Sequence, residues 1–227
     1  MIKIERRDTA KAQRAIEDLQ EARRLKSSYN TEGVNQALRE IFYGKCYICE
    51  NKKATSYQIE HLIPHRGDEK LKYDWQNLFL SCAHCNNIKS DKYEPVLDCT
   101  KEPVEKLIAF RKKGYFGSEE RLEFTACVEA DEKIKNTIAL LEDAYYGTIP
   151  QKKMEAKIIQ KELREELSKF KECVREYQEA EDEEEKEDIE ILLKRELKDS
   201  SAFTAFKRWL IWDNNMYSEI EKCIPES

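Results

Sequence analysis

The chain has 227 residues, enough for one sizeable core or for a compact module joined to a helical body. Charged residues make up 38% of it, and the mean hydropathy is −0.81, which is typical of a helix-rich protein outside the membrane. No apolar run approaches the length of a membrane span, and the first stretch, MIKIERRDTAKAQ, lacks the apolar core of a signal peptide. We therefore expect a cytoplasmic protein that does not enter the membrane.

The net charge of −6 excludes a protein that holds nucleic acid by bulk electrostatics alone. The charge is unevenly distributed along the chain. Residues 1–98 carry 17 Lys and Arg against 15 Asp and Glu, whereas residues 99–227 carry 23 against 31. We expect any nucleic-acid contact to lie in the first part and the second part to serve another purpose.

Residues 1–44 contain two segments with apolar residues at helical spacing, separated near SSYNTEG. We interpret them as two helices that lead into the first cysteine pair. The apolar positions are Ala12, Ile16, Leu19 and Ala22 in the first segment, and Val34, Leu38 and Ile41 in the second.

Residues 45–95 differ in composition and pattern: turn residues, β-branched residues and aromatics replace the helical periodicity. All three histidines lie here. The stretch SYQIEHLI is typical of a β-strand, with His61 near its end and Pro64 breaking it. This region predicts a small module that depends on a metal ion for its stability.

Residues 96–227 are predicted to be helical and to form the third part of the chain. PVEKLIAFRKKG begins with a proline suited to a first helical turn and ends at a glycine, and DEKIKNTIALLEDAYY is a further helix. Residues 152–178 predict a long helix, and another passes through Ile189, Leu192 and Leu197. We interpret the acidic run EAEDEEEKEDIE as a solvated helix face or hairpin tip, or as the partner-binding tip of a helical hairpin.

Two C-x-x-C pairs, CYIC and CAHC, carry the strongest chemical signal in the sequence. Four thiolates at this spacing satisfy tetrahedral zinc, and an all-cysteine site leaves no position open for water or substrate. We therefore predict one structural Zn²⁺ per chain, held by Cys46, Cys49, Cys82 and Cys85. The alternatives are four buried cysteines without a metal and, for an exported protein, a disulfide framework. Cys99, Cys127, Cys173 and Cys223 are interpreted as small apolar packing residues.

The stretch IEHLIPH lies between the two cysteine pairs. If the cysteines fill all four coordination positions of the zinc, His61 and His65 are not needed as its ligands and can have another role. A zinc hydrolase that uses both histidines is an alternative, and it would need a second zinc. Pro64 between them, and a glutamate that precedes the first histidine, argue against the helical zinc-protease pattern.

The order of these motifs resembles the HNH endonuclease superfamily, in the subgroup with a zinc-bound cysteine quartet. Two C-x-x-C pairs bracket IEHLIP and DWQNL, and the second pair continues as CAHCNNIK. The resemblance implies a ββα-metal module within a protein of the α+β class that is mostly α, embedded between N-terminal helices and a long helical C-terminal region.

The resemblance also implies roles for single residues. His61 matches the general base that activates water, Asn77 matches the asparagine that orients this histidine, and Glu60 and Asn86 match ligands of a catalytic Mg²⁺ or Mn²⁺. Asn86 stands where histidine is commoner, and Asn87 or His84 is an alternative ligand. Because neighbours on a regular strand face opposite ways, Glu60 and His61 can share a centre only at a strand end or bend.

Further residues have both a functional and a structural interpretation. Arg66, Lys89 and His65 are candidates for contacts with the nucleic-acid phosphates, although each of the first two can be a surface charge and His65 a hydrogen-bonded turn residue. His84 is interpreted as a solvent-facing residue or a phosphate contact. Trp75 is interpreted as a core residue.

The flanks MIKIERR and TIALLEDAYY and the helical tail resemble HNH proteins encoded beside an ATPase in bacterial anti-phage systems, such as Septu and some retrons. The resemblance implies an effector nuclease that cuts nucleic acid, with DNA favoured over RNA, and an ATPase partner that docks on the C-terminal helices. The alternative is a non-catalytic zinc module that binds nucleic acid or protein.

Overall fold

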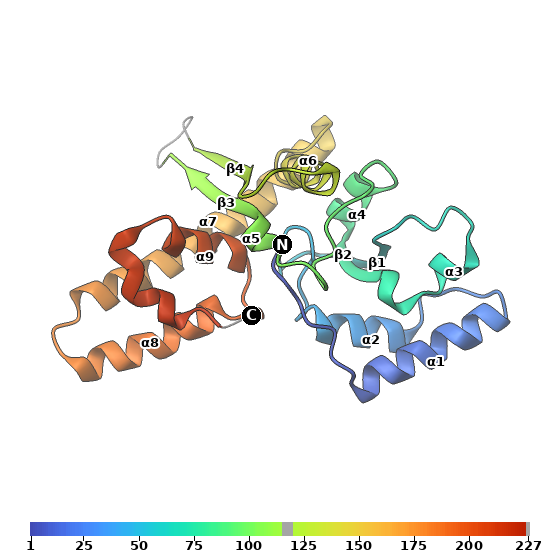
Figure 1. The fold of residues 1–227 in the computed structure, drawn as a ribbon, viewed down its shortest axis with the longest axis horizontal. Helices are drawn as coiled ribbons and strands as arrows, with labels where there is room; N and C mark the ends of the chain where they lie inside the picture. The colour runs from blue at the N-terminus through green and yellow to red at the C-terminus, as the bar shows by residue number, and fades with distance from the viewer. Residues whose placement is uncertain (115–119, 226–227) are drawn as a thin grey trace.

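The computed structural model describes residues 1–114 and 120–225. It is a mostly helical α+β protein in which a small β-sheet module lies between an N-terminal helix pair and a long helical region (Figure 1). The first part contains α1 (Ala10–Arg24), α2 (Glu32–Ile41), β1 (Tyr57–His61), α3 (Glu69–Lys72), the 3₁₀ helix η1 (Trp75–Asn77), β2 (Leu78–Cys82) and α4 (Ala83–Lys89). The second part contains α5 (Val104–Leu107), β3 (Ile108–Lys113), β4 (Arg121–Ala126), α6 (Glu132–Tyr146), α7 (Pro150–Glu179), α8 (Glu183–Leu197), α9 (Thr204–Trp212) and the 3₁₀ helix η3 (Asn215–Cys223).

The N-terminal helix pair forms where the apolar spacing predicted it. Each helix begins at a threonine whose hydroxyl accepts a backbone hydrogen bond, Thr9 from Ala12 and Thr31 from Val34. The two helices pack against each other and bury one apolar face each. The buried residues are Ala12, Ala15, Leu19 and Ala22 in α1, and Gly33, Val34, Ala37, Leu38 and Ile41 in α2.

The central module has a ββα arrangement. Strands β1 and β2 pair antiparallel, with Tyr57 opposite Cys82 and His61 opposite Leu78. Helix α4 follows β2 without a loop, and the Cys82 sulfur accepts the backbone N–H of Cys85 at 3.5 Å. The predicted strand around IEH is thus confirmed, and His61 is its last residue.

The predicted helix at PVEKLIAFRKKG is wrong beyond its first turn. The chain leaves α5 at Leu107 and continues as strand β3, which pairs antiparallel with β4. Phe110 and Phe124 lie opposite each other in this pairing, and their ring centroids are 5.3 Å apart. Phe206 of α9 packs on both rings. This aromatic packing, which depends on residues far along the chain, outweighs the local helical preference.

The long C-terminal helices form a hairpin, as expected. α7 begins with Pro150 in its first turn and packs along α8 after a short turn. The acidic run occupies that turn and the start of α8, where Asp182 caps the helix by accepting the N–H of Glu185. Carboxylates in a first helical turn interact favourably with the helix dipole. A second, smaller core fills the space between α7, α8, α9 and η3.

The main hydrophobic core extends through all three predicted parts of the chain. It joins Val34 of α2 and Leu80 of β2 to Leu140 of α6 and Leu163 of α7. Apolar contacts thus continue across residues 44 and 95. The division of the chain into three parts at these positions stays a prediction. None of the eight cysteines, all of which lie in the described ranges, forms a disulfide; Cys99, Cys173 and Cys223 are buried as predicted, whereas Cys127 is exposed, contrary to expectation.

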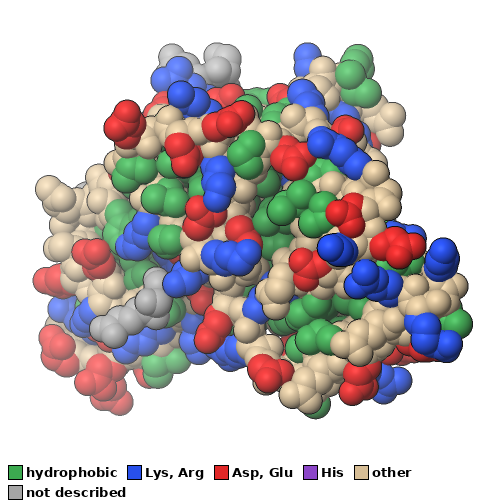
Figure 2. Space-filling view, turned by 45° about the vertical axis from the view of Figure 1, so that its right-hand side comes forward, with side chains coloured by type: hydrophobic (Ala, Val, Ile, Leu, Met, Phe, Trp, Pro, Cys, Tyr) green, Lys and Arg blue, Asp and Glu red, His purple; other side chains and the backbone are tan. Residues whose placement is uncertain are grey.

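The surface carries side chains of both charges. Figure 2 shows Lys and Arg mixed with Asp and Glu across one face of the molecule, with apolar groups between them. Within the two described ranges, every helix is too short or too polar to cross a membrane.

Candidate functional site: a cysteine quartet beside a polar cavity

The four cysteines of the two C-x-x-C pairs meet in one buried cluster. The first pair lies in the loop after α2, and the second lies at the junction of β2 and α4. Their four sulfur atoms all lie within 4.8 Å of one another. Tetrahedral zinc with Zn–S bonds of about 2.3 Å needs sulfur atoms about 3.8 Å apart. The Cys49 and Cys82 sulfurs are 3.9 Å apart, so a small contraction of the cluster would give this geometry.

A metal ligand must be a thiolate, and the cluster favours that form at one cysteine, Cys46. Hydrogen bonding to Cys46 raises the pKa of Cys49, and burial raises the pKa of Cys85. Burial raises the pKa of Cys46, but hydrogen bonds from Cys49, Cys82 and Cys85 outweigh it and hold that pKa well below its usual value. Ser81 adds a contact to the Cys46 sulfur at 3.6 Å. The cluster can therefore stabilise a thiolate in an otherwise apolar surrounding.

His61 lies at the end of β1 with one ring nitrogen already engaged. Its Nε2 is 3.0 Å from the carbonyl oxygen of Lys72 at the end of α3. Because a carbonyl oxygen only accepts, Nε2 must carry the proton, and the lone pair remains on Nδ1. Burial lowers the pKa of His61, which keeps the ring neutral. The imidazole is thus held in the form that can accept a proton.

Asn77 connects the segments on either side of His61. Its side-chain oxygen accepts the N–H of Ile63 at 2.8 Å, and its Nδ2 donates to the carbonyls of Ile63 at 2.8 Å and Leu71 at 3.1 Å. Leu71 directly precedes Lys72, whose carbonyl holds the imidazole. The amide thus fixes the backbone that orients His61, although it does not touch the ring itself.

Glu60 is buried and both of its carboxylate oxygens have partners. Oε1 lies 2.6 Å from Lys89 Nζ, and Oε2 accepts the hydroxyl of Tyr47 at 2.7 Å. Lys89 Nζ also donates to the carbonyl of His61 at 2.9 Å. Burial raises the pKa of Glu60 and the ammonium of Lys89 opposes that rise. The pair ties α4 to the end of β1.

Lys89 is fully buried, so in this arrangement its ammonium serves Glu60 and the strand and faces no phosphate. Asn86 is on the same helix but on its exposed side, where Nδ2 donates to Gln58 Oε1 at 2.6 Å. Within the described part of the chain, Asn86 Oδ1 makes no hydrogen bond, so this oxygen can receive a ligand.

A cavity of about 390 Å³ brings most of the predicted site residues together. Its walls include Glu60, His61, His65, Arg66 and Asn86. Since His61 ends β1, the alternation of side chains along a strand does not keep it from sharing this cavity with Glu60. Asn77 and Lys89 are not among its lining residues, but Lys89 binds Glu60, and Asn77 binds the backbone of Ile63 and Leu71.

His65 and Arg66 lie in the turn after Pro64. The Nδ1 of His65 accepts the N–H of Gly67 at 3.1 Å, which agrees with the interpretation of a hydrogen-bonded turn residue. Arg66 is 62% exposed and pairs with Glu94 at 2.9 Å. Both side chains border the cavity, and the exposed guanidinium can exchange its partner for an anion at low cost.

The interpretation of His84 as a solvent-facing residue is wrong. Its side chain is 8% exposed; Nδ1 lies 2.7 Å from Glu155 Oε2 of α7, and Nε2 lies 2.8 Å from the carbonyl of Ala144 in α6. These partners follow it by 60 and 71 positions, so no local pattern could reveal them. His84 joins the helix of the second cysteine pair to the C-terminal region.

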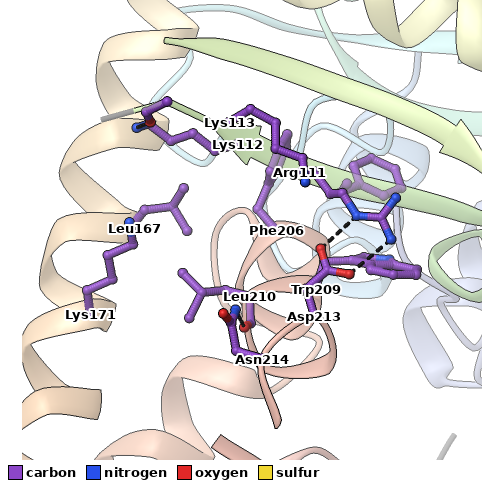
Figure 3. A pocket seen from close by; sticks show the side chains of 12 residues that line it. Arg111, Lys112, Lys113, Leu167, Lys171, Phe206, Trp209, Leu210, Asp213 and Asn214 are labelled. Atoms are coloured by element: carbon purple, nitrogen blue, oxygen red, sulfur yellow. Dashed lines mark hydrogen bonds and ion pairs between the residues drawn. The ribbon is translucent and has the colours of Figure 1, made fainter. Parts of the chain in front are cut away.

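A separate cavity of about 420 Å³ lies where β3, α7 and α9 meet. Figure 3 shows Asp213 paired with Arg111 beside Trp209, with Lys171 on the opposite wall. Arg111 donates two hydrogen bonds to the Asp213 carboxylate, of 2.7 and 2.9 Å. None of the described residues that line it was predicted as a site residue.

Comparison with known proteins agrees with this geometry. Residues 46–92 match the family model of the HNH endonucleases. This segment is an HNH module. It spans β1, β2 and α4, and it contains the cysteine quartet, His61 and Asn77. The predicted ββα module is thereby confirmed. No solved structure matches the chain significantly.

The chain is also similar to two curated proteins, each named Septu protein PtuB. The protein from Bacillus mycoides (strain KBAB4) is 34% identical over 84 residues, and that from Bacillus thuringiensis is 32% identical over 73 residues. Each match covers 30% of this chain and 28% of the relative. The expected resemblance to the HNH component of Septu-type systems is confirmed as sequence similarity over this part of the chain.

The Glu60–Lys89 pair gives a stability prediction. Lys89→Met leaves Glu60 buried without its counter-charge, so the free energy of unfolding in magnesium-free buffer at pH 7.5 should fall by about 3–5 kcal/mol. Without Lys89, the pKa of Glu60 rises further. A carboxyl with a raised folded-state pKa stabilises the fold only when protonated, so the loss should shrink as the pH is lowered.

Urea unfolding followed by circular dichroism measures this effect. The matched control is the double variant Glu60→Gln/Lys89→Met, which carries no charge at either position and should recover part of the loss. A Lys89→Met protein as stable as the wild type at pH 7.5 would show that the pair is not buried as described.

Proposed function

We propose that this chain is a metal-dependent HNH endonuclease that hydrolyses phosphodiester bonds of nucleic acid, with DNA favoured over RNA. We further propose that it is the effector nuclease of an anti-phage system and works with an ATPase partner. The observation that carries the proposal is His61, a neutral imidazole with its tautomer fixed by Lys72, in one cavity with Glu60 and Asn86.

In this proposal His61 is the general base. Its Nδ1 accepts a proton from a water molecule, which then attacks phosphorus, while Nε2–H stays bound to the Lys72 carbonyl. The positive charge that develops on the ring is stabilised by that carbonyl. Asn77 keeps the carbonyl in place through the neighbouring Leu71. Arg66 and His65 at the cavity rim are suited to contact the phosphates on either side.

Zinc is the metal that we assign to the cysteine quartet. Four buried sulfur ligands at this spacing suit Zn²⁺, and they leave no coordination position for water. Its role is to hold the loop after α2 against β2 and α4. We assign one zinc to each chain.

Glu60 and Asn86 fit a second, hard cation such as Mg²⁺ or Mn²⁺. Both offer oxygen atoms to the cavity, and each carboxylate oxygen of Glu60 has a lone pair beyond the one that its present partner uses. An ion there would have to share Glu60 with Lys89 or displace its ammonium. When bound, such an ion stabilises negative charge on the phosphate and on the leaving oxygen.

Two alternative functions have less support. A zinc hydrolase built on His61 and His65 needs a second zinc, but among the described residues only the cysteine quartet groups three or more such ligands. Nδ1 of His65 is also occupied by Gly67. A non-catalytic adaptor does not need the fixed tautomer of His61 or the shared cavity, which therefore favour the enzyme.

Substitution of His61 tests the catalytic proposal. His61→Ala removes the base, so cleavage of plasmid DNA with Mg²⁺ should slow by roughly 10²- to 10⁴-fold. RNA is assayed in parallel, and each substrate is tested with and without the ATPase. Zinc content should be unchanged, because His61 is outside the quartet.

Lys70→Ala is the matched control, since it removes an exposed charge from α3, the helix that ends at Lys72, and should cleave normally. Full cleavage by His61→Ala would refute the nuclease mechanism. Loss of cleavage in both variants would show that the assay reports surface charge and not a general base.

The outer face of α8, in the α7–α8 hairpin, is the surface that we propose for the ATPase. The outer face of α8 is acidic, and it exposes Ile191 by 65% and Leu192 by 38%. Large apolar side chains at such exposure on a charged helix are typical of a docking surface. A partner with basic residues around an apolar patch would complement it.

A single substitution on this hairpin should separate docking from folding. Ile191→Asp should weaken binding of the ATPase at least about tenfold, because an apolar contact is replaced by a desolvated charge. The control is Ile158→Asp on α7, at a side chain of similar exposure, 61%, outside the proposed surface. Co-purification and titration measure binding. Equal binding by both variants and the wild type would exclude α8 as the docking surface.

A further inference from the structure

Tyr29 brings the N-terminal helix pair into the nuclease site. It lies in the loop between α1 and α2, outside the residues that match the HNH family, and it lines the same cavity as His61. The centroids of the Tyr29 and His61 rings are 4.7 Å apart with an interplanar angle of 82°. This is the edge-to-face arrangement that aromatic rings prefer.

The loop that carries Tyr29 is anchored at both ends. On one side the hydroxyl of Tyr73 donates to the carbonyl of Ser27 at 2.7 Å, which ties the loop to the segment after α3. On the other side Thr31 caps α2 and donates its hydroxyl to Asp18 of α1 at 2.8 Å. Tyr29 is therefore presented to His61 by a fixed backbone.

His61 needs a second constraint besides its single hydrogen bond. The bond from Nε2 to Lys72 holds one edge of the imidazole, but the ring can still turn about its bond to Cβ, because such torsions are broad. A turned ring would offer the wrong nitrogen to the cavity. Two rings restrict this motion, Tyr29 at 4.7 Å and His65 at 4.8 Å. His65 belongs to a turn at the cavity rim, whereas Tyr29 is held by the helix pair.

We propose that Tyr29 is a positioning residue, whose aromatic ring holds the His61 imidazole in the orientation that directs Nδ1 into the cavity. The inference deepens the proposed nuclease function and rests on it for its catalytic consequence. It assigns the N-terminal helix pair a part in the active site, since the loop between the two helices contributes Tyr29 to the lining of the cavity. The ring carries the effect, and the phenol hydroxyl is not needed.

Imidazole NMR tests the positioning without requiring any activity. In the zinc-loaded wild type, the Nε2 proton of His61 should give a protected signal of a single tautomer. Tyr29→Phe keeps the ring and should keep that signal. Tyr29→Leu removes the ring while filling much of its volume, and the signal should be lost to exchange with water. A protected Nε2 signal that persists in Tyr29→Leu would overturn the proposal.

Single-turnover cleavage of plasmid DNA tests the catalytic consequence. Tyr29→Leu should lower the rate at saturating enzyme about 10-fold, with the half-saturating enzyme concentration changed less than about twofold, because ring orientation affects the chemical step and not binding. Tyr29→Phe should stay within about twofold of the wild type. The control is Tyr217→Leu, a partly buried tyrosine of the second core.

The outcomes separate this inference from the proposed function. If His61→Ala cleaves normally, the nuclease function fails, whatever the NMR signal of Tyr29→Leu shows. If His61→Ala is inactive but Tyr29→Leu cleaves like the wild type, the positioning role fails alone. If Tyr29→Phe is as slow as Tyr29→Leu, the hydroxyl acts directly on the substrate, and the proposal that the ring carries the effect is overturned.

Discussion

The meeting of four cysteine sulfurs from two distant pairs is the constraint on which the rest of the module depends. The sheet it supports has only two strands, and a sheet of this size is at best marginally stable by itself. The zinc that we propose for this quartet would join the loop after α2 to the start of α4, and so fix where β2 ends and where the helix begins. Binding free energy of this kind is also folding free energy. The position of His61 at the end of β1 follows from that frame.

A set of buried polar contacts then positions the residues of the candidate catalytic site. Lys89 ties α4 to Glu60 and to the His61 backbone, while Asn77 ties the strand end to the segment that holds Lys72. These groups are largely buried and form hydrogen bonds with one another. Because the surroundings have a low dielectric constant, each of these hydrogen bonds is strengthened. His84 extends the same rigidity to α6 and α7. The HNH module is thereby built into the helical body and shares its core.

The sequence predicted the parts of the protein that depend on short-range patterns. The cysteine spacing, the strand ending at His61 and the amphipathic helices α1, α2, α6 and α7 are all local features. What could not be predicted depends on distant partners. The strands β3 and β4 exist because Phe110 meets Phe124 and Phe206, and His84 is buried because α7 supplies Glu155. Tyr29 was missed because an aromatic residue in a polar loop has no pattern that points to His61.

The central claim is that the cysteines alone saturate the structural metal and thereby leave His61 free to act as a base. X-ray absorption spectroscopy of the zinc-loaded protein measures this directly. Our account predicts one zinc per chain, surrounded by four sulfur atoms at about 2.3 Å, and an unchanged spectrum in His61→Ala. A nitrogen or oxygen atom in the first coordination sphere of the zinc, lost on substitution of His61, would contradict the account.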